Sequence, residues 1–163
     1  MTKILRSNFF ESKNTAKIAQ NLLGKFLVRR SRKKTVAYMI TEVEAYCGLE
    51  DKASHAHKGK TKRNEPMFGS ADHWYVYLIY GMYQMLNIVT SPKNYPAAIL
   101  IRGLEGASGP GKLTKKLKIN NFLNNKKAVP KNGLWIEDRG VKIKNIDIKK
   151  SARIGVDYAG PVW

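Results

Sequence analysis

The chain has 163 residues, of which 43% are hydrophobic, and this is enough for one globular domain with its own core. Its 30 Lys and Arg against 12 Asp and Glu give a net charge of +18, which favours a polyanionic partner such as nucleic acid. The single cysteine, Cys47, excludes an internal disulfide and a zinc site built on cysteines.

A membrane surface would also attract this charge. However, no apolar run approaches the length of a spanning helix, and no segment clearly sets its basic residues opposite an apolar stripe, so we expect no membrane partner. The first eight residues lack the apolar core of a secretory signal. We therefore expect a cytoplasmic, nucleoid-associated protein that is not secreted.

The N-terminal third predicts a helix followed by two strands. Asn14 or Thr15 can cap a helix that places Ile18, Leu22 and Leu23 on one face, and Gly24 ends it. Residues 25–30 then predict a strand. The basic residues 31–34 predict a hairpin turn, which either touches phosphate or is simply solvated.

A second strand is predicted from Thr35 to Tyr46. Its even positions are apolar as far as Ile40 and then become Glu42, Glu44 and Tyr46, so one face is expected to change from apolar to acidic. A carboxylate at the end of an apolar face is partly desolvated, which makes it a better proton acceptor near neutral pH. The alternative is a sheet edge kept soluble by two acidic residues.

A polar loop and a tyrosine-rich hairpin follow. The loop contains Glu50, Asp51, His55 and His57, and then a basic run with Lys60, Lys62 and Arg63 that is either a phosphate-contacting loop or merely solvated. Residues 74–83 hold one Trp and four Tyr, with a Gly where a hairpin could turn. Such strands often belong to a core, but aromatics beside a basic loop can also stack a base and hold its backbone.

The remaining elements are short. Residues 91–96 predict a loop, and residues 97–102 predict a buried strand that ends in Arg102, which should face an acid, either at a polar site or in a structural salt bridge. The segment before Lys112 begins an amphipathic helix whose first amides could hold a phosphate or simply cap the helix. After a polar connector at 120–131, strands are predicted at 134–136 and 141–148, and no internal repeat is present.

Taken in order, several of these motifs resemble the 3-methyladenine DNA glycosylases of the alkyladenine (N-methylpurine) type. The resemblance covers nearly the whole chain, and the ordered series is far more specific than any single motif. The motifs that carry it are Glu42–Tyr46, Asp51–His55, Arg63–Asn64 with Met67–Phe68, Tyr75–Met82, Asn87 and Gly109–Leu113.

The resemblance implies a role for each site residue. Glu44 would activate a water that attacks the sugar C1′ and would stabilise the positive charge developing there, while Arg102 and the carbonyl of Ile154 would hold that water. The base-binding residues would be Tyr46, His55, Tyr77 and, discriminating against the 2-amino group of guanine, Asn87. Tyr80 would wedge into the duplex, and Lys60, Lys62, Arg63 and Lys112 are weaker candidates for phosphate contacts.

The resemblance also implies a fold and a reaction. The fold would be one mixed α/β (α+β) domain over residues 1–163, with a curved antiparallel sheet, flanking helices and a protruding hairpin. The family usually continues past the position of this chain's last residue, Trp163, so the chain is either naturally short or trimmed, and the resemblance leaves open whether the final strand is present. The activity would be monofunctional hydrolysis of damaged purines, among them 3-methyladenine and hypoxanthine, from double-stranded DNA by a monomer without cofactor.

Three alternatives remain. A non-catalytic basic nucleic-acid-binding module would explain the charge and the tyrosines, but an acid beside a stacking platform would repel phosphate. A lyase would need an amine nucleophile, and the lysines are too many to single one out. A metal could be bound by the carboxylates and histidines, although His55 and His57 form a poor metal signature, so no metal is expected.

Overall fold

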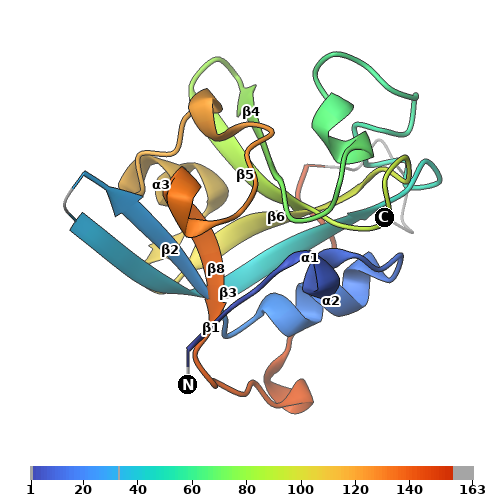
Figure 1. Cartoon of the computed structure of the whole chain (residues 1–163). Coiled ribbons are helices and arrows are strands. Elements are labelled where there is room, and N and C mark those ends of the chain that lie inside the picture. The colour runs from blue at the N-terminus through green and yellow to red at the C-terminus, as the bar shows by residue number, and fades with distance from the viewer. Residues whose placement is uncertain (1, 33, 156–163) are drawn as a thin grey trace.

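The computed structural model of the protein describes residues 2–32 and 34–155. Its strands form one open antiparallel sheet in the order β1-β8-β2-β3-β6-β5-β4, with β7 paired to β6 (Figure 1). Their bounds are β1 (Lys3–Ile4), β2 (Phe26–Ser31), β3 (Lys34–Cys47), β4 (Trp74–Ile79), β5 (Tyr83–Val89), β6 (Ala97–Leu104), β7 (Ala107–Ser108) and β8 (Leu134–Asp138).

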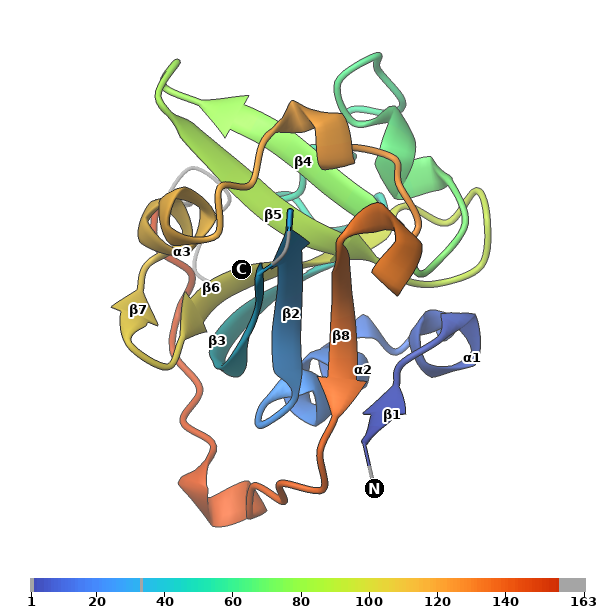
Figure 2. The ribbon, with the colours of Figure 1, turned by 60° about the vertical axis from the view of Figure 1, so that its left-hand side comes forward.

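Three α-helices flank this sheet in the described part of the chain: α1 (Ser7–Phe10), α2 (Thr15–Leu22) and α3 (Pro110–Lys116). Short 3₁₀ helices lie at Glu65–Phe68, Asn121–Leu123, Pro130–Asn132 and Asn145–Asp147. The predicted mixed α/β fold, with a curved sheet, flanking helices and a projecting hairpin, is confirmed; Figure 2 shows the β4–β5 hairpin extending past β2 and β8. The prediction about a last strand concerns residues after Gly155 and lies outside the described residues.

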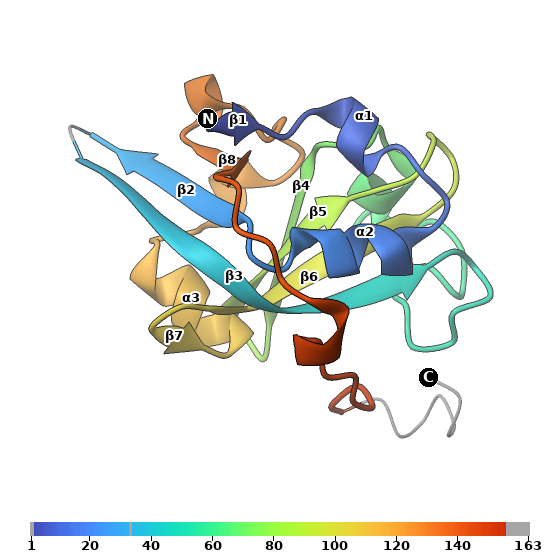
Figure 3. The ribbon, with the colours of Figure 1, turned by 90° about the horizontal axis from the view of Figure 1, so that it is seen from below.

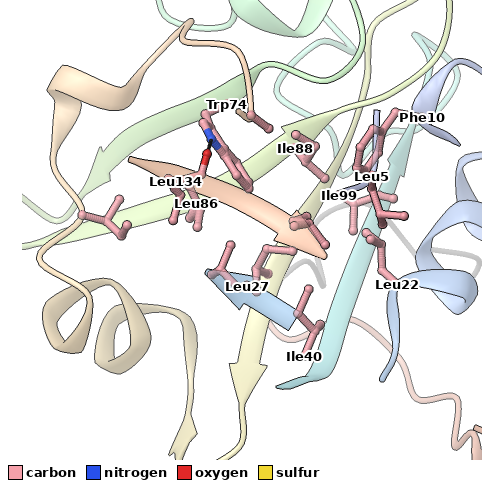
Figure 4. Close-up of a cluster of buried hydrophobic side chains, with 14 of the residues drawn as sticks. Leu5, Phe10, Leu22, Leu27, Ile40, Trp74, Leu86, Ile88, Ile99 and Leu134 are labelled. Atoms are coloured by element: carbon pink, nitrogen blue, oxygen red, sulfur yellow. Dashed lines mark hydrogen bonds between the residues drawn. The ribbon is translucent and has the colours of Figure 1, made fainter. Parts of the chain in front are cut away.

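The main hydrophobic core lies between the two halves of the curved sheet (Figure 4). Leu27, Ile40 and Leu134 come from one half, and Leu86 and Ile99 come from the other. Trp74 is fully buried among them, and its indole Nε1 donates a hydrogen bond to the carbonyl of Leu134 at 3.2 Å. Trp74 joins the two halves of the sheet, because its large apolar ring fills the core while its one polar atom, Nε1, is hydrogen-bonded.

The predicted helix, strand and hairpin turn of the N-terminal third are confirmed, but the placement of Leu23 on the helix face is wrong, because Leu23 follows α2 as its C-cap and lies outside the core. The side chain of Asn14 accepts a hydrogen bond from the amide of Lys17 at 3.0 Å and caps α2. Gly24 follows the helix with φ of +79°, a conformation that favours glycine. Strands β2 and β3 pair up to Ser31 and Lys34, so the basic turn between them is a hairpin.

Strand β3 changes face midway along its length. Before the change, Val36 and Ile40 contact the main core, whereas Val43 and Ala45 contact it afterwards. The pairing with β6 is irregular between Ile40 and Val43, and this bulge places two residues, instead of the usual one, between successive inward side chains. The prediction of one face that runs from apolar to acidic is therefore wrong, because Glu44 lies on the face opposite to Ile40.

The strand predicted at residues 141–148 is also wrong. That segment crosses below α2 without strand pairing and contains the 3₁₀ helix Asn145–Asp147 (Figure 3). Strand β8, which precedes it, is already paired with β1 on one side and β2 on the other. With both edges of β8 occupied, the apolar residues have no neighbouring strand there to join, and Ile146 is left 88% exposed.

None of the helices in residues 2–32 and 34–155 combines the length and apolar content needed to cross a lipid bilayer.

The bulge in β3 depends on a glycine in the facing strand. A Cβ added to Gly103 would lie 3.0 Å from Cβ of Glu42 and 3.1 Å from Oγ1 of Thr41. We therefore expect Gly103→Ala to lower the free energy of unfolding by about 1–3 kcal/mol, measured by urea denaturation. Thr41→Ala should recover part of this loss in the double variant, and a Gly103→Ala protein as stable as wild type would contradict this account.

Because the carboxyl group of Asp72 is buried, we expect the stability of the protein to depend on pH. Its side chain is fully buried, and Oδ1 has no hydrogen-bond partner among the described residues. Burial raises the pKa of Asp72 to about 6, so the folded state retains a proton that the unfolded chain loses near pH 4. Stability contributed by this proton is present below about pH 4 and is lost as the pH rises through about 6.

Asp72→Asn should remove this loss. Between about pH 4 and pH 7, the free energy of unfolding of the wild type should decrease by on the order of 1–3 kcal/mol more than that of the variant. Urea denaturation at several pH values measures the difference, and Asp147→Asn, at an exposed position, serves as the control. Parallel pH profiles for wild type and Asp72→Asn would contradict the prediction.

Candidate active site

The sheet brings the candidate site residues together on the face opposite to the main core. Glu44 on β3 pairs with Leu100 on β6, Leu100 pairs with Asn87 on β5, and Asn87 pairs with Tyr75 on β4. Side chains of directly paired residues point to the same face, so these four form one row across four strands. Tyr46 begins the next row on that face.

Glu44 is held by two donors. Its carboxylate accepts a hydrogen bond from Nη1 of Arg102 at 3.0 Å and a short one from the hydroxyl of Tyr46. Arg102 also donates from Nε to Glu42 at 2.9 Å, so one guanidinium bridges both glutamates, and the prediction that Arg102 faces an acid is confirmed. Glu44 is only 9% exposed, and its geometry is fixed by charge-assisted hydrogen bonds.

Tyr46 acts in this arrangement as a donor. Burial, followed by the neighbouring charge of Glu44, raises the pKa of Tyr46 far above its usual value. The phenol therefore stays protonated throughout the neutral range and keeps its proton directed at the carboxylate.

An aromatic cluster adjoins Glu44. The rings of His55 and Tyr77 meet edge to face with centroids 4.7 Å apart, and the ring of Tyr75 lies 5.1 Å from that of Tyr77. Nδ1 of His55 is 3.2 Å from the hydroxyl of Tyr75. Burial, together with the charge of Arg63, lowers the pKa of His55, so its ring is neutral at neutral pH and available for stacking.

The loop that carries His55 is anchored from within. The side-chain amide of Asn64 donates hydrogen bonds to the carbonyls of His55 at 2.8 Å and Gly59 at 2.9 Å. His57, by contrast, turns away and places Nδ1 2.7 Å from the carbonyl of Leu49. Within residues 2–32 and 34–155, no three His, Cys, Asp or Glu side chains converge as metal ligands.

Asn87 lies buried between Glu44 and the tyrosines. Its side-chain nitrogen donates to the carbonyl of Tyr75 at 3.1 Å. This bond fixes the amide in the floor of the aromatic cluster, where a group bound against Tyr75 or Tyr77 would meet it.

A groove of about 880 Å³ opens beside Glu44 and continues along β3. Glu44, Arg102 and Ile154 all line it, so the structure brings the three predicted catalytic residues to one cavity. Ile154 is 74% exposed on the segment that follows the last 3₁₀ helix. The groove gives water access to the Glu44 carboxylate.

Tyr80 occupies the tip of the β4–β5 hairpin. Tyr80 and Gly81 have φ of +52° and +66°, and the amide of Met82 donates to the carbonyl of Ile79 at 3.1 Å to close the turn. Tyr80 is 82% exposed, which is unusual for a side chain of this size. Directly after the turn, Tyr83 packs against Gly111 of α3.

The predicted phosphate contacts divide into two groups. Lys62 and Lys112 are exposed. Lys60 instead pairs with Glu65 at 3.0 Å, and Arg63 lies 5.1 Å from the centroid of Tyr77 and donates to the carbonyl of Leu78. Arg63 therefore supports the aromatic cluster, and its role toward phosphate, like that of the other three, remains a prediction.

Sequence comparisons identify the family. The methylpurine-DNA glycosylase (MPG) family matches residues 8–107 and 104–163. A relative from Methanocella arvoryzae is 45% identical over 96% of this chain and 86% of its own length. This chain belongs to the methylpurine-DNA glycosylase family.

Two further relatives agree with the assignment. One from Legionella pneumophila (strain Paris) is 41% identical over 98% of this chain and 88% of its own length. Another from Clostridioides difficile is 35% identical over 95% of this chain and 94% of its own length. All three relatives carry the provisional name 3-methyladenine DNA glycosylase.

One residue of the site was not predicted from the sequence. Arg153 forms two hydrogen bonds to the fully buried Asp51, at 2.7 and 2.8 Å, and another to the carbonyl of Ala45. Its guanidinium also lies 4.7 Å from the ring centroid of Tyr46. Asp51 stood out as a nearby acid, but nothing local in the sequence pairs it with an arginine 102 residues away.

Arg153 fastens the C-terminal segment, and with it Ile154, to the site. Removing one partner of a buried pair leaves an uncompensated charge. Arg153→Gln should therefore lower the free energy of unfolding by about 2–4 kcal/mol in urea denaturation. Lys60→Gln breaks an exposed pair with Glu65 and, as the matched control, should cost under about 1 kcal/mol.

The double variant Asp51→Asn/Arg153→Gln separates this ion pair from other effects. Its loss of stability should be smaller than the sum of the two single losses, because each single change already breaks the pair. Strict additivity would show that Arg153 and Asp51 stabilise the fold independently and would contradict this interpretation.

Proposed function

We propose that this protein is a DNA glycosylase that removes damaged purines, 3-methyladenine among them, from duplex DNA and leaves an abasic site. The observation that carries the proposal is the Glu44 carboxylate, held by Arg102 and Tyr46 at the junction of a solvent groove and an aromatic cluster. Membership of the methylpurine-DNA glycosylase family and the names of the relatives support it. The net charge of +18 suits a polyanionic substrate.

Recognition would begin with the exposed hairpin. The exposed Tyr80 would enter the stack of base pairs as a base leaves it. The base would then stack against Tyr46 and against His55 and Tyr77 of the aromatic cluster. Extruding a base costs a few kcal/mol and each good aromatic stack returns roughly 1–3 kcal/mol, so damaged and weakly paired bases are favoured. Electron-rich tyrosine rings also attract the positive charge of an alkylated purine.

Asn87 would add selectivity. Its amide is fixed in the floor of the cluster by its bond to Tyr75, so it cannot easily move aside. A purine that carries an exocyclic 2-amino group would collide with it, which favours adenine-like bases and hypoxanthine over guanine.

Hydrolysis would take place at Glu44. Each carboxylate oxygen accepts one protein hydrogen bond and retains a lone pair for a water in the groove. As the water oxygen bonds to C1′, the bond from C1′ to the base breaks and its electron pair leaves with the base, while the water proton passes to Glu44. A cationic alkylpurine leaves as a neutral base and needs no proton, and the negative carboxylate stabilises the charge on the sugar.

The alternative is a basic module that binds nucleic acid without chemistry. Such a module would gain nothing from a buried acid beside its stacking surface, since the acid repels phosphate. The arrangement of Glu44, Arg102 and Tyr46 therefore favours the enzyme.

Glu44→Gln tests the proposal directly. In single-turnover release of 3-methyladenine or hypoxanthine from a duplex, in EDTA, the variant should be slower than wild type by roughly 10²–10⁴-fold, because a general base is lost. Its affinity for the duplex should be unchanged or higher. Glu42→Gln is the matched control, since Glu42 also contacts Arg102 but does not contact Tyr46, and it should lose less than about 10-fold.

Equal losses in both variants would show that the bridge to Arg102, and not Glu44 itself, is what matters. No release by wild type together with tight duplex binding would support the binding module. Release that stops in EDTA would contradict the expectation of metal independence.

A further inference from the structure

A second groove, of about 710 Å³, lies away from the candidate active site. It runs between the β2–β3 hairpin and the C-terminal end of α3. Five of its lining side chains are cationic: Arg29, Arg32, Lys34, Lys116 and Lys118.

Among the described residues, no acid lines this groove. The hairpin belongs to residues 12–41 and α3 to residues 106–136, and neither stretch contains an Asp or a Glu. Two acid-free stretches, far apart in sequence, therefore meet at one groove and produce a concentrated positive potential.

Two of the five cations hold the walls of the groove in place. Arg29 donates to the carbonyls of Leu117 and Gly133, each at 3.1 Å, and so ties the end of α3 to β2. Lys116 lies 4.4 Å from the ring centroid of Tyr38 and donates to the carbonyl of Gly106.

The other three cations face solvent. Arg32, Lys34 and Lys118 are exposed, and in residues 2–32 and 34–155 none of them forms an ion pair with an acid. They remain available to an external anion.

The groove and the Tyr80 hairpin lie at opposite ends of α3. Figure 1 shows α3 between the β2–β3 hairpin and the β4–β5 hairpin. The first turn of α3 contacts Tyr83, which pairs with Ile79 beside the turn that carries Tyr80, and the last turn of α3 reaches the groove. A seven-residue helix is about 10 Å long, and the turn between Tyr83 and Tyr80 adds about 5 Å, so the groove lies roughly 15 Å from Tyr80.

We propose that this groove binds phosphates of duplex DNA about four to five base pairs from the flipped base, since base pairs are stacked about 3.4 Å apart. The distance from the base rests on the proposed glycosylase function, whereas the binding of DNA by the groove does not. The contact lengthens the DNA footprint and adds affinity without taking part in hydrolysis.

The test compares two triple variants that remove the same charge. Arg32→Gln/Lys34→Gln/Lys118→Gln alters the groove, and Lys17→Gln/Lys142→Gln/Lys144→Gln alters exposed lysines elsewhere. Fluorescence anisotropy measures Kd for a duplex of about 24 base pairs with a stable abasic analogue at its centre, between about 50 and 200 mM salt. The slope of log Kd against log salt should fall by roughly two to three for the groove variant and by less than about one for the control.

A duplex of about six base pairs, closed by a hairpin loop to keep it paired, extends only about three pairs from the lesion and should not reach the groove, so the groove variant should bind it like the control. Single-turnover base release at saturating enzyme should be unchanged. Equal slopes for the two triple variants on the long duplex would overturn the proposal. An RNA duplex on which the groove variant loses as much slope as on DNA, or more, would also overturn it and would assign the groove to RNA. A slope change without base release by wild type would overturn the glycosylase function and leave the groove as a DNA contact.

Discussion

The irregular pairing of β3 with β6 is the constraint on which the site depends. It lets Ile40 and Val43 both contact the main core and turns Glu44 and Tyr46 to the opposite face. With regular alternation, Glu44 would share a face with Ile40 and its charge would be directed at the core, where an unpaired carboxylate is very costly. Gly103 makes the bulge possible because it has no side chain where the two strands approach most closely.

The second requirement is electrostatic. In a chain with a large excess of positive charge, the two acids nearest the site are each neutralised by an arginine from a distant part of the sequence: Glu44 by Arg102 and Asp51 by Arg153. Charge-assisted hydrogen bonds of this kind fix the direction of a carboxylate as well as its charge. A negative group can therefore remain beside an aromatic cluster on a protein whose surface attracts phosphate.

The site is assembled from segments that differ in how firmly they are held. The sheet supplies Glu44, Arg102, Asn87 and Tyr77, whose backbones are fixed by strand pairing. The loop with His55 is fixed by Asn64, and the C-terminal segment with Ile154 is tied to the site by Arg153. The candidate site therefore has a rigid floor and two walls, each of which is held by a few polar contacts.

The sequence by itself determined the elements whose signals are local. The cap of α2, the basic β2–β3 turn, the tyrosine hairpin with Gly81 and the acid-facing Arg102 all follow from residue types at short spacing. Resemblance to a family added the roles of the site residues, which local pattern could not assign. Only the tertiary structure decided the face on which Glu44 lies, the partner of Asp51, the irregular course of residues 141–148 and the meeting of two acid-free stretches at one groove. The physical reason is that each of these depends on which strand edges are already paired and on contacts between residues far apart in the chain, and neither leaves a periodic signal in the sequence.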